Sequence, residues 1–340
     1  MIEIDGSHGE GGGALLRISA ALSALTVKPI HITNIRANRP KSGLMPQHLN
    51  SVKAVAGLSN ARVEGLEIES KELFFYPEDV RGGTYNIDVK TAGSVTLVLQ
   101  AFMVPALFAD APVNIKIRGG TDVRWSPPVN YLQHVTLPVL RSMGYNAELD
   151  IICRGHYPRG GGIINVKINP VKKLNPINVS ELKVDKIRGI SHAVKLPEHV
   201  AARQAESAEK VLKANGFDAE IEVEHSDNTL GPGSGIVLWT EGNSRIGGSS
   251  IGERGVRAEK VGQKAAEELL YNISRGATVD KYIGDQIIPY MAIAGKSRVK
   301  TAELTLHAVT NIFVTEKIMG KKFDVDGEVG EPATIKISKN

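Results

Sequence analysis

The chain repeats its own pattern with a period of roughly 80 residues. Residues 10–17 open a helical pattern that runs to Pro29, and an alternating strand pattern follows over residues 30–35. Residues 92–100 open the same order of patterns, and the strand that ends it follows Pro112. Units of this length bury their apolar faces against neighbouring copies, so we expect related units that pack into one larger body.

Each copy continues with a second helix and two strands. Residues 48–61 change from a helical to a strand pattern, and residues 134–147 repeat that change. The strand pattern of residues 82–89 returns at residues 161–168. The repeat therefore predicts α+β units of the form β-α-β-α-β-β.

A third, partial copy is expected near the end of the chain. Its pattern predicts a helix over residues 286–294 and a strand over residues 301–305. A further helix is expected to begin near Asn311, and a last strand to cover residues 333–337. The chain thus resumes the same order of elements after an interruption.

Between the second and third copies the pattern changes. Residues 183–196 alternate like a strand, residues 198–215 form an amphipathic helical pattern, and residues 256–274 form a second one. Two short strands are expected between these helices, at residues 218–224 and 236–239. This order predicts a smaller β-α-β-β-α domain inserted before the third unit.

The change of pattern sets the expected domain boundaries. We expect a large repeat domain, which carries the active site, made of residues 1–180 and 277–340. A smaller inserted domain is expected over residues 181–276. Boundaries inferred from sequence patterns carry a tolerance of about four residues.

Cysteine content and the first residues bear on the cellular compartment. A single Cys153 excludes an intrachain disulfide, and the acidic start of the chain differs from the basic start of a signal peptide. The most apolar stretch, residues 95–109, is short for a bilayer and is interrupted by Gln100 and Pro105. We therefore expect a cytoplasmic protein with no membrane partner. The net charge of +4 is too small to indicate a partner by itself.

Residues 9–14 form a glycine-rich turn between a short strand and a helix, and they nominally satisfy the dinucleotide fingerprint G-x-G-x-x-A. A dinucleotide site would place an acid after the second strand, where this chain has Arg36 and Arg39. The free N–H groups at a helix start instead favour an anion, and Glu10 beside them suits a divalent metal. A glycine turn with a dipole-stabilised carboxylate remains the alternative.

Cationic and polar side chains gather after the second strand. Arg36, Arg39 and Lys41 lie in one loop, and Gln47 lies near the start of the next helix. Arg17 lies one helical turn beyond the glycine-rich turn. If strand ends and helix starts meet on one side of the sheet, these groups converge on a phosphate-rich ligand. A solvated basic face is the alternative.

His307 lies in a segment with a strand pattern. Alternation places Leu304 and Leu306 on one face of the expected strand. It places Thr305 and His307 on the other face, away from the apolar layer. The residues alone leave two interpretations open, a bystander histidine on the surface or a nucleophile in a cleft.

Taken in order, these motifs resemble those of the RNA 3'-terminal phosphate cyclase family. The similarity covers nearly the whole chain, through residues 5–13, 36–39, 47–48, 92–94, 97–100, 119–122, 284–286 and 307–311. It implies a fold similar to the one that the repeat predicts. Three β-α-β-α-β-β units share a large domain, and a smaller β-α-β-β-α domain is inserted before the third.

The resemblance implies an ATP-dependent, ligase-type enzyme that acts on RNA. In this family a histidine attacks the α-phosphorus of ATP, assisted by a divalent metal, Mg or Mn, and forms a covalent histidine-AMP. AMP then passes to a 3'-terminal phosphate of RNA, and the neighbouring 2'-hydroxyl displaces it to leave a 2',3'-cyclic phosphate. The partners implied are ATP and RNA with a 3'-terminal phosphate.

The family's site residues are carried to this chain by position. The resemblance makes His307 the nucleophile and places Glu10 near the metal and the phosphates. The adenylate pocket is implied to consist of Gln100, Tyr282, Ile283, Gly284, Asp285 and Gln286. The terminal phosphate of the RNA is implied to be held by Arg17, Arg36, Arg39 and Gln47. For Asp285, a helix cap is the structural alternative to a contact with the ribose.

Two other functions have to be distinguished from this one. A catalytically silent cyclase-like RNA-binding factor in ribosome biogenesis would give His307 no role, so the presence of that histidine argues against it. A transferase of the enolpyruvyl type uses similar repeats but offers no reason for a histidine on an exposed face. The physiological RNA, the preferred metal and the oligomeric state are not predicted.

Overall fold

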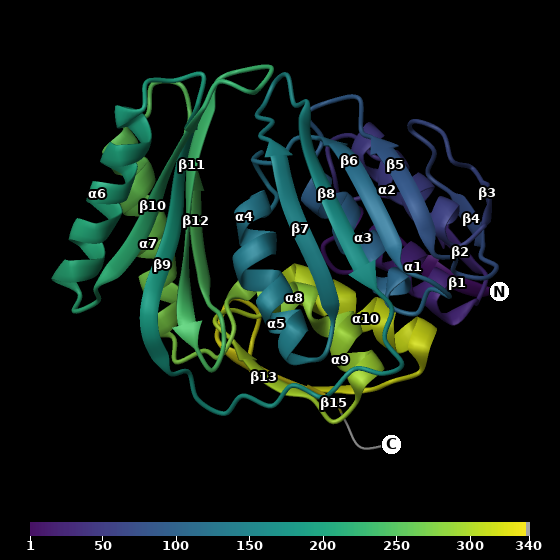
Figure 1. Ribbon diagram of the computed structural model, residues 1–340. Helices are drawn as coiled ribbons and strands as arrows, with labels where there is room; N and C mark the ends of the chain where they lie inside the picture. Colours follow the sequence, from purple (N-terminus) through teal and green to yellow (C-terminus); the bar gives the residue numbers. More distant parts are fainter. Residues whose placement is uncertain (338–340) are drawn as a thin grey trace.

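The computed structural model describes residues 1–337, which form a mixed α+β fold (Figure 1). Within these residues the strands form four small sheets. The α+β class expected from the sequence is confirmed. The last three residues of the segment 277–340 lie outside the described residues.

The first sheet is built by the first 76 residues of the chain. Its elements are β1 (Ile2–Asp5), α1 (Gly13–Thr26), β2 (Ile30–Thr33), α2 (Pro46–Leu58), β3 (Arg62–Glu64) and β4 (Leu73–Tyr76). The strands lie in the order β1-β2-β4-β3, with β1 parallel to β2 and the other pairs antiparallel. The parallel pair leaves the turn before α1 and the loop after β2 at the same edge of the sheet.

The second sheet has the same arrangement of strands. Its elements are β5 (Gly83–Asp88), α3 (Val95–Ala106), β6 (Val113–Gly119), α4 (Val129–Tyr131), the π-helical turn η1 (Leu132–Thr136), α5 (Leu137–Ser142), β7 (Asn146–Cys153) and β8 (Gly162–Asn169). The order is β5-β6-β8-β7, with β5 parallel to β6 and the other pairs antiparallel.

The third sheet has three strands within the described residues. Its elements are α8 (Lys281–Gln286), α9 (Ile288–Ala294), β13 (Arg298–Thr301), α10 (Leu306–Met319), β14 (Phe323–Asp326) and β15 (Ala333–Ile337), and the strand order is β13-β15-β14. In place of a first strand, two isolated parallel bridges join Asn178 to Arg298 and Val279 to Thr301. The segments that enter and leave the inserted region therefore both lie beside β13.

The inserted region forms the fourth sheet. Its elements are β9 (Val184–Val194), α6 (His199–Ala214), β10 (Ala219–Ser226), β11 (Gly233–Gly242), β12 (Gly247–Ile251) and α7 (Ala258–Ser274). The strand order is β10-β9-β11-β12. Figure 1 shows α6 and α7 on the outer face of this green sheet, while its other face is turned towards α4, α5 and β7.

One strand of the insert differs from the sequence prediction. The pattern predicts β-α-β-β-α, whereas β12 adds a strand before α7 by pairing antiparallel to β11. Its residues are mostly glycine and serine, which have low strand propensity, so pairing and packing decide its conformation. At Gly248 a Cβ atom would lie 2.5 Å from the Ala265 carbonyl oxygen, and its absence lets α7 approach the sheet.

Two apolar clusters hold these layers together. The larger one contains most of α3, joins the repeat sheets to their helices and also includes Ile190, Val237 and Trp239 of the inserted sheet. The second lies between the inserted sheet and its helices and includes Ile187, Leu212, Leu238 and Leu269. Burial of each such side chain stabilises the fold by roughly 1.5–3 kcal/mol, so the insert has an apolar core of its own.

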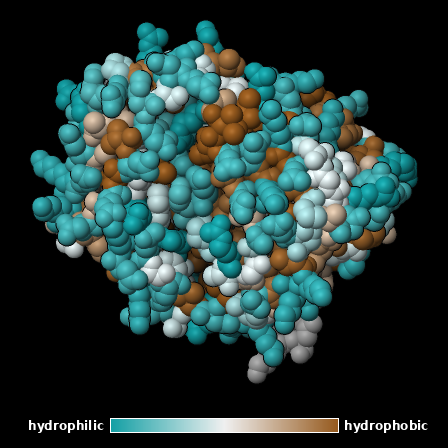
Figure 2. All heavy atoms as spheres, viewed as in Figure 1, coloured by the Kyte–Doolittle hydropathy of each residue, from teal (hydrophilic) through white to brown (hydrophobic). Residues whose placement is uncertain are grey.

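Hydrophilic side chains dominate the face shown in Figure 2, with apolar patches near its top and centre. Some large side chains project far into solvent, including Trp125, which is 92% exposed. Among residues 1–337, no helix is both long and apolar enough to cross a membrane.

Asp280 connects the insert to the third unit. Its carboxylate caps α8 by accepting the backbone N–H groups of Tyr282 and Ile283, at 2.9 and 3.0 Å. It also accepts the Tyr131 hydroxyl at 2.6 Å and the backbone N–H of Gly247 in β12 at 2.7 Å. One buried side chain therefore satisfies donors from three separate segments.

We expect Asp280→Ala to lower the free energy of unfolding by about 3 kcal/mol or more, because several buried donors lose a charged acceptor. Urea denaturation of Asp280→Ala measures this loss. Asp218→Ala is the control, since Asp218 is exposed just before β10. Equal midpoints for the two variants would show that Asp280 does not hold these segments together.

Candidate active site

The glycine-rich turn between β1 and α1 lies against the last helix of the chain. Gly9 and Gly11 have φ angles of 61° and 58°, which L side chains rarely adopt. The backbone N–H of Glu10 donates to the Thr310 hydroxyl in α10 at 3.1 Å. A Cβ atom on Gly12 would lie 2.8 Å from the side chains of both Glu10 and Arg39. The turn thus brings the first and last parts of the described chain together.

His307 lies in the first turn of α10, and the prediction of a strand at this position is wrong. The helix begins at Leu306 because the Thr305 hydroxyl caps it by accepting the Ala308 N–H at 3.0 Å. The expected strand ends earlier, at Thr301. The side chain of His307 nevertheless points away from the apolar layer, as predicted, and it is 47% exposed.

Glu10 lies between His307 and Arg39. Its Oε2 atom is 2.7 Å from Nδ1 of His307, and its Oε1 atom forms an ion pair with the Arg39 guanidinium. The Glu10 side chain is only 12% exposed, so both contacts are partly shielded from water. Because the carboxylate faces Nδ1, the other ring nitrogen of His307, Nε2, is the one left for a ligand.

Arg17 and His48 lie beside the same turn. A Cβ atom on Gly13 would collide with the His48 ring and approach Arg17. Arg17 is buried in α1, and burial lowers its pKa to about 10. Burial, together with the charges of Arg17, Arg36 and Arg39, lowers the pKa of His48 to about 3. The structure therefore gathers the expected arginines around a neutral imidazole, a positive setting that suits an anion.

Arg36 and Gln47 have partners within their own surroundings. Nη1 of Arg36 donates to the carbonyl oxygens of Lys41 and Gly43, at 2.7 and 3.0 Å, and so holds the loop in shape. Nε2 of Gln47 donates to the Ser94 carbonyl at the start of α3, at 3.0 Å. The Gln47 Oε1 atom is buried and forms no hydrogen bond with any described residue. Both side chains lie near the other cationic side chains, but each already forms hydrogen bonds that hold the local structure in place.

Asp285 is buried close to His307. The Thr305 hydroxyl donates to its carboxylate, and Nδ2 of Asn311 donates to its backbone oxygen at 2.8 Å. Burial raises the pKa of Asp285 to about 7, although the Thr305 hydroxyl and His307 oppose the rise. The alternative of a helix cap is wrong for this residue, because Asp280 caps α8 and Asp285 lies near the end of that helix.

The other residues expected in the adenylate pocket lie farther along α8 and in α3. The Tyr282 hydroxyl donates to Glu268 of α7 at 3.0 Å, and Gln286 accepts the Thr136 hydroxyl at 3.2 Å. Ile283 is buried, Gly284 faces Thr301, and Gln100 is half-buried in α3. Within residues 1–337, no hydrogen bond or ion pair joins Tyr282, Gln286 or Gln100 to His307.

The charges around His307 shift the pKa of its ring, and this shift can be measured. Burial lowers the pKa of His307, Arg17 and Arg39 lower it too, and Asp285 opposes them. We expect Arg39→Gln to raise the pKa of His307, because it removes a like charge and frees Glu10 to stabilise the protonated ring. A pH titration of the ring protons by NMR measures the change. Lys41→Gln, in the same loop, is the control, and an unchanged or lower pKa in Arg39→Gln would contradict the expectation.

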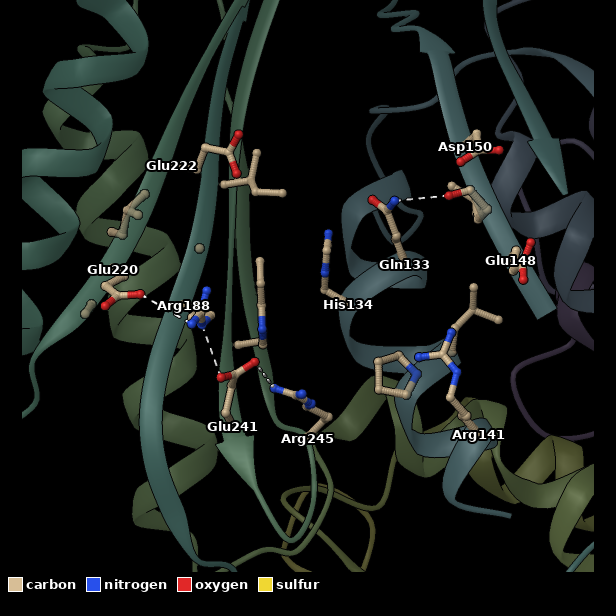
Figure 3. Close-up of a pocket in the computed structure, with 18 of the residues that line it drawn as sticks. Gln133, His134, Arg141, Glu148, Asp150, Arg188, Glu220, Glu222, Glu241 and Arg245 are labelled. Atoms are coloured by element: carbon tan, nitrogen blue, oxygen red, sulfur yellow. Dashed lines mark hydrogen bonds and ion pairs between the residues drawn. The ribbon is translucent and has the colours of Figure 1, made fainter. Parts of the chain in front are cut away.

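A separate polar cleft, with a volume of about 1050 Å³, lies between the inserted sheet and the second unit (Figure 3). Its labelled charged residues are Arg141, Glu148, Asp150, Arg188, Glu220, Glu222, Glu241 and Arg245. Acidic side chains outnumber basic ones there, and none of the expected site residues lines it. A phosphate-rich ligand is therefore favoured at the glycine-rich turn and not in this cleft.

A half-exposed histidine beside a shielded carboxylate, with arginines around a helix start, defines a protein that handles phosphorylated ligands. Comparison with known proteins agrees with this class. The chain belongs to the RNA 3'-terminal phosphate cyclase family, whose model matches residues 8–325.

Three archaeal proteins named RNA 3'-terminal phosphate cyclase are similar to nearly the whole chain. The protein of Methanothermobacter thermautotrophicus is 55% identical over 99% of this chain and 100% of its own length. The protein of Pyrococcus furiosus is 50% identical over 99% of this chain and 98% of its own length. The protein of Methanopyrus kandleri is 49% identical over the same shares of the two chains.

Proposed function

We propose that this protein uses ATP to convert a 3'-terminal phosphate of RNA to a 2',3'-cyclic phosphate through a covalent adduct on His307. The observation that carries the proposal is the contact of His307 with Glu10 at the edge of a group of arginines. Membership of the family and the shared name of its relatives support it. The alternative of a silent RNA-binding factor leaves this arrangement without a purpose.

The first step forms a bond between His307 and AMP. Nε2 of the neutral ring attacks the α-phosphorus of ATP, and the bond to the β-phosphate oxygen breaks to release pyrophosphate. The lowered pKa of His307 keeps its lone pair free near neutral pH. The Glu10 carboxylate, 2.7 Å from Nδ1, stabilises the positive charge that the ring gains.

Two further displacements complete the reaction. An oxygen of the RNA 3'-phosphate attacks the phosphorus of the adduct, and the bond between nitrogen and phosphorus breaks to restore His307. The 2'-hydroxyl of the same ribose then attacks the activated 3'-phosphorus and gives up its proton, and AMP leaves. Each step expels a good leaving group, which is the advantage of a covalent route.

A divalent ion, Mg or Mn, fits the residues around Glu10. Oε2 of Glu10 is buried and accepts no aligned hydrogen bond from the described residues. A single carboxylate that acts with substrate phosphates is a common environment for such ions. When bound, the ion would neutralise part of the charge of the phosphates.

The remaining residues divide between the two substrates. We assign Gln100, Tyr282, Ile283, Gly284, Asp285 and Gln286 to the nucleotide, and Arg17, Arg36, Arg39 and Gln47 to the RNA phosphate. Arg39 serves both halves of the site, since it also pairs with Glu10. Arg36 acts mainly by shaping the loop, because one of its terminal nitrogens is already bound to two carbonyl groups.

The proposal is tested by incubating the protein with ATP, Mg²⁺ or Mn²⁺ and an RNA oligomer that ends in a 3'-phosphate. We expect a product whose terminal phosphate resists phosphatase, and no reaction of the matched oligomer with a 3'-hydroxyl. Binding of both oligomers without any change of the ends would instead support the silent RNA-binding factor.

We also propose that three related β-α-β-α-β-β units form one domain of residues 1–180 and 277–340, and that residues 181–276 form a second. The shared strand order of the first two sheets and the separate apolar cluster of the insert support this division. We expect brief trypsin treatment to cut first near Lys172 and Arg275 and to release an insert-sized fragment. First cuts within α6 or α7 would contradict these boundaries.

A further inference from the structure

A buried group of potential metal ligands lies outside the site described above. Asp122 follows β6, His156 lies in the loop between β7 and β8, and His192 lies in β9 of the inserted sheet. All three are buried, with exposures of 1%, 4% and 1%. One potential ligand atom from each side chain lies within 4.8 Å of the other two. The group shares no residue with the surroundings of His307 and Glu10.

The two histidine rings have the spacing of ligands on one ion. Nε2 of His156 lies 3.3 Å from Nε2 of His192. Two nitrogens that bind one tetrahedral zinc ion at 2.0–2.1 Å are separated by about the same distance. A neutral imidazole can offer its lone pair to a metal.

Two polar atoms of the group have no partner within residues 1–337. Oδ1 of Asp122 and Nδ1 of His192 are both buried and form no hydrogen bond there. The other carboxylate oxygen of Asp122 accepts the Thr121 hydroxyl at 2.7 Å, so the side chain is oriented while Oδ1 stays free. The free carboxylate oxygen and the two facing imidazole rings can each offer a lone pair to a metal. Such a set of lone pairs suits a cation.

Arg154 is the nearest positive charge, and it is largely engaged elsewhere. It donates to Asn130 at 2.7 Å and pairs with Glu224 at 2.5 Å, whereas its nearest approach to Asp122 is 3.5 Å. Arg154 therefore divides its charge between Glu224 and Asp122. Arg154 approaches Oδ2 of Asp122, and the Oδ1 atom stays available to a cation at the histidine pair.

We propose that Asp122, His156 and His192 bind a zinc-type divalent ion that joins the inserted sheet to the second sheet. Two imidazoles favour zinc over magnesium, which prefers oxygen ligands. Three protein ligands leave the fourth position of a tetrahedral site for water. The ion would hold the two parts together, because His192 lies in the inserted sheet, the other two ligands lie in segments next to strands of the second sheet, and all three are buried.

The test begins with metal analysis of the full-length protein after dialysis against a low concentration of zinc. We expect about one zinc ion per chain, and a visible absorption spectrum of tetrahedral cobalt when Co²⁺ replaces it. Removal of the ion with a chelator should lower the melting temperature, and zinc should restore it where magnesium does not.

Single substitutions test whether the ion binds to this group of residues. His156→Ala, His192→Ala and Asp122→Asn should each lose at least tenfold in zinc affinity. His134→Ala and Glu10→Gln should retain the ion, since His134 stacks on Trp239 outside the group and Glu10 belongs to the other site. Circular dichroism of each variant checks its fold, and Asp122→Asn keeps the shape of the side chain if the alanine variants unfold.

Absence of bound zinc, or equal zinc binding by Asp122→Asn and the unaltered protein, would overturn the proposal. The two histidines would then share a proton in an ordinary hydrogen bond at the observed 3.3 Å. Because the readout is bound metal, this outcome is independent of whether the protein cyclises RNA.

Discussion

Replacing His307 with alanine is expected to abolish covalent labelling of the protein by ATP labelled at its α-phosphorus. The imidazole is the nucleophile in the proposed reaction, and alanine offers no atom in its place. Loss of a nucleophile commonly costs on the order of a thousandfold or more in rate. Denaturing gels of His307→Ala and of the unaltered protein measure the adduct directly. The adduct itself should be labile in acid and stable in alkali, as a bond between nitrogen and phosphorus requires.

The choice of control makes this experiment specific. His199→Ala, at the exposed start of α6, should be labelled as strongly as the unaltered protein. His307→Ala should also keep its melting temperature, because the side chain is half-exposed and its loss leaves no large cavity. Undiminished labelling of His307→Ala would remove this histidine from the mechanism.

Replacing Arg17 with glutamine is expected to separate the two halves of the reaction. Arg17 is buried beside the glycine-rich turn, and it forms no ion pair within residues 1–337, so its charge is available for a phosphate. A charge-assisted hydrogen bond in such a site contributes about 1.5–3 kcal/mol, which corresponds to roughly a 10- to 150-fold change. We expect cyclisation of a 3'-phosphorylated RNA to fall by that factor while the His307 adduct still forms.

The assay pH matters for this comparison. Arg17 is one of the charges that lower the pKa of His307, so Arg17→Gln raises that pKa towards the ordinary value of histidine. At pH 8 the ring remains neutral in both proteins, and the adduct then reports nucleotide binding and attack alone. A parallel loss of adduct and cyclic product in Arg17→Gln at pH 8 would place Arg17 in the ATP site.

Arg17→Lys and Arg62→Gln complete the series. Lysine keeps the charge but not the two-pronged guanidinium, so partial recovery of cyclisation is expected. Arg62 lies exposed in β3, and its loss should leave both steps unchanged. Arg39→Ala is less selective, because its ion pair with Glu10 links it to the surroundings of His307.

Local patterns predicted the long helices well. The apolar periodicity of residues 198–215 and 256–274 corresponds to α6 and α7 within a few residues, because each helix buries one face against the inserted sheet. The pattern failed at Thr305, where alternation suggested a strand and the hydroxyl instead caps α10. A threonine two residues before His307 was the available signal for that helix start.

The candidate site was predictable only in part for a similar reason. The glycine-rich turn and the arginine loop pointed to an anion, since these features are local in the sequence. The contact of Glu10 with Thr310 joins positions 300 residues apart, and no local pattern reveals such a pairing. Asp280 was missed as well, although an aspartate just before a helical pattern is a recognisable cap. His48 was part of a recognised motif but was given no role in the site.

The hydrogen bond from Glu10 to Thr310 also bears on how the protein is made. Glu10 leaves the ribosome 300 residues before Thr310, and His307 leaves it shortly before Thr310. The carboxylate and the histidine therefore meet only after the whole segment between them has been synthesised. A nascent chain that stops before residue 307 carries the glycine-rich turn but not the histidine, so the contact between Glu10 and His307 forms only after the later segment has been made.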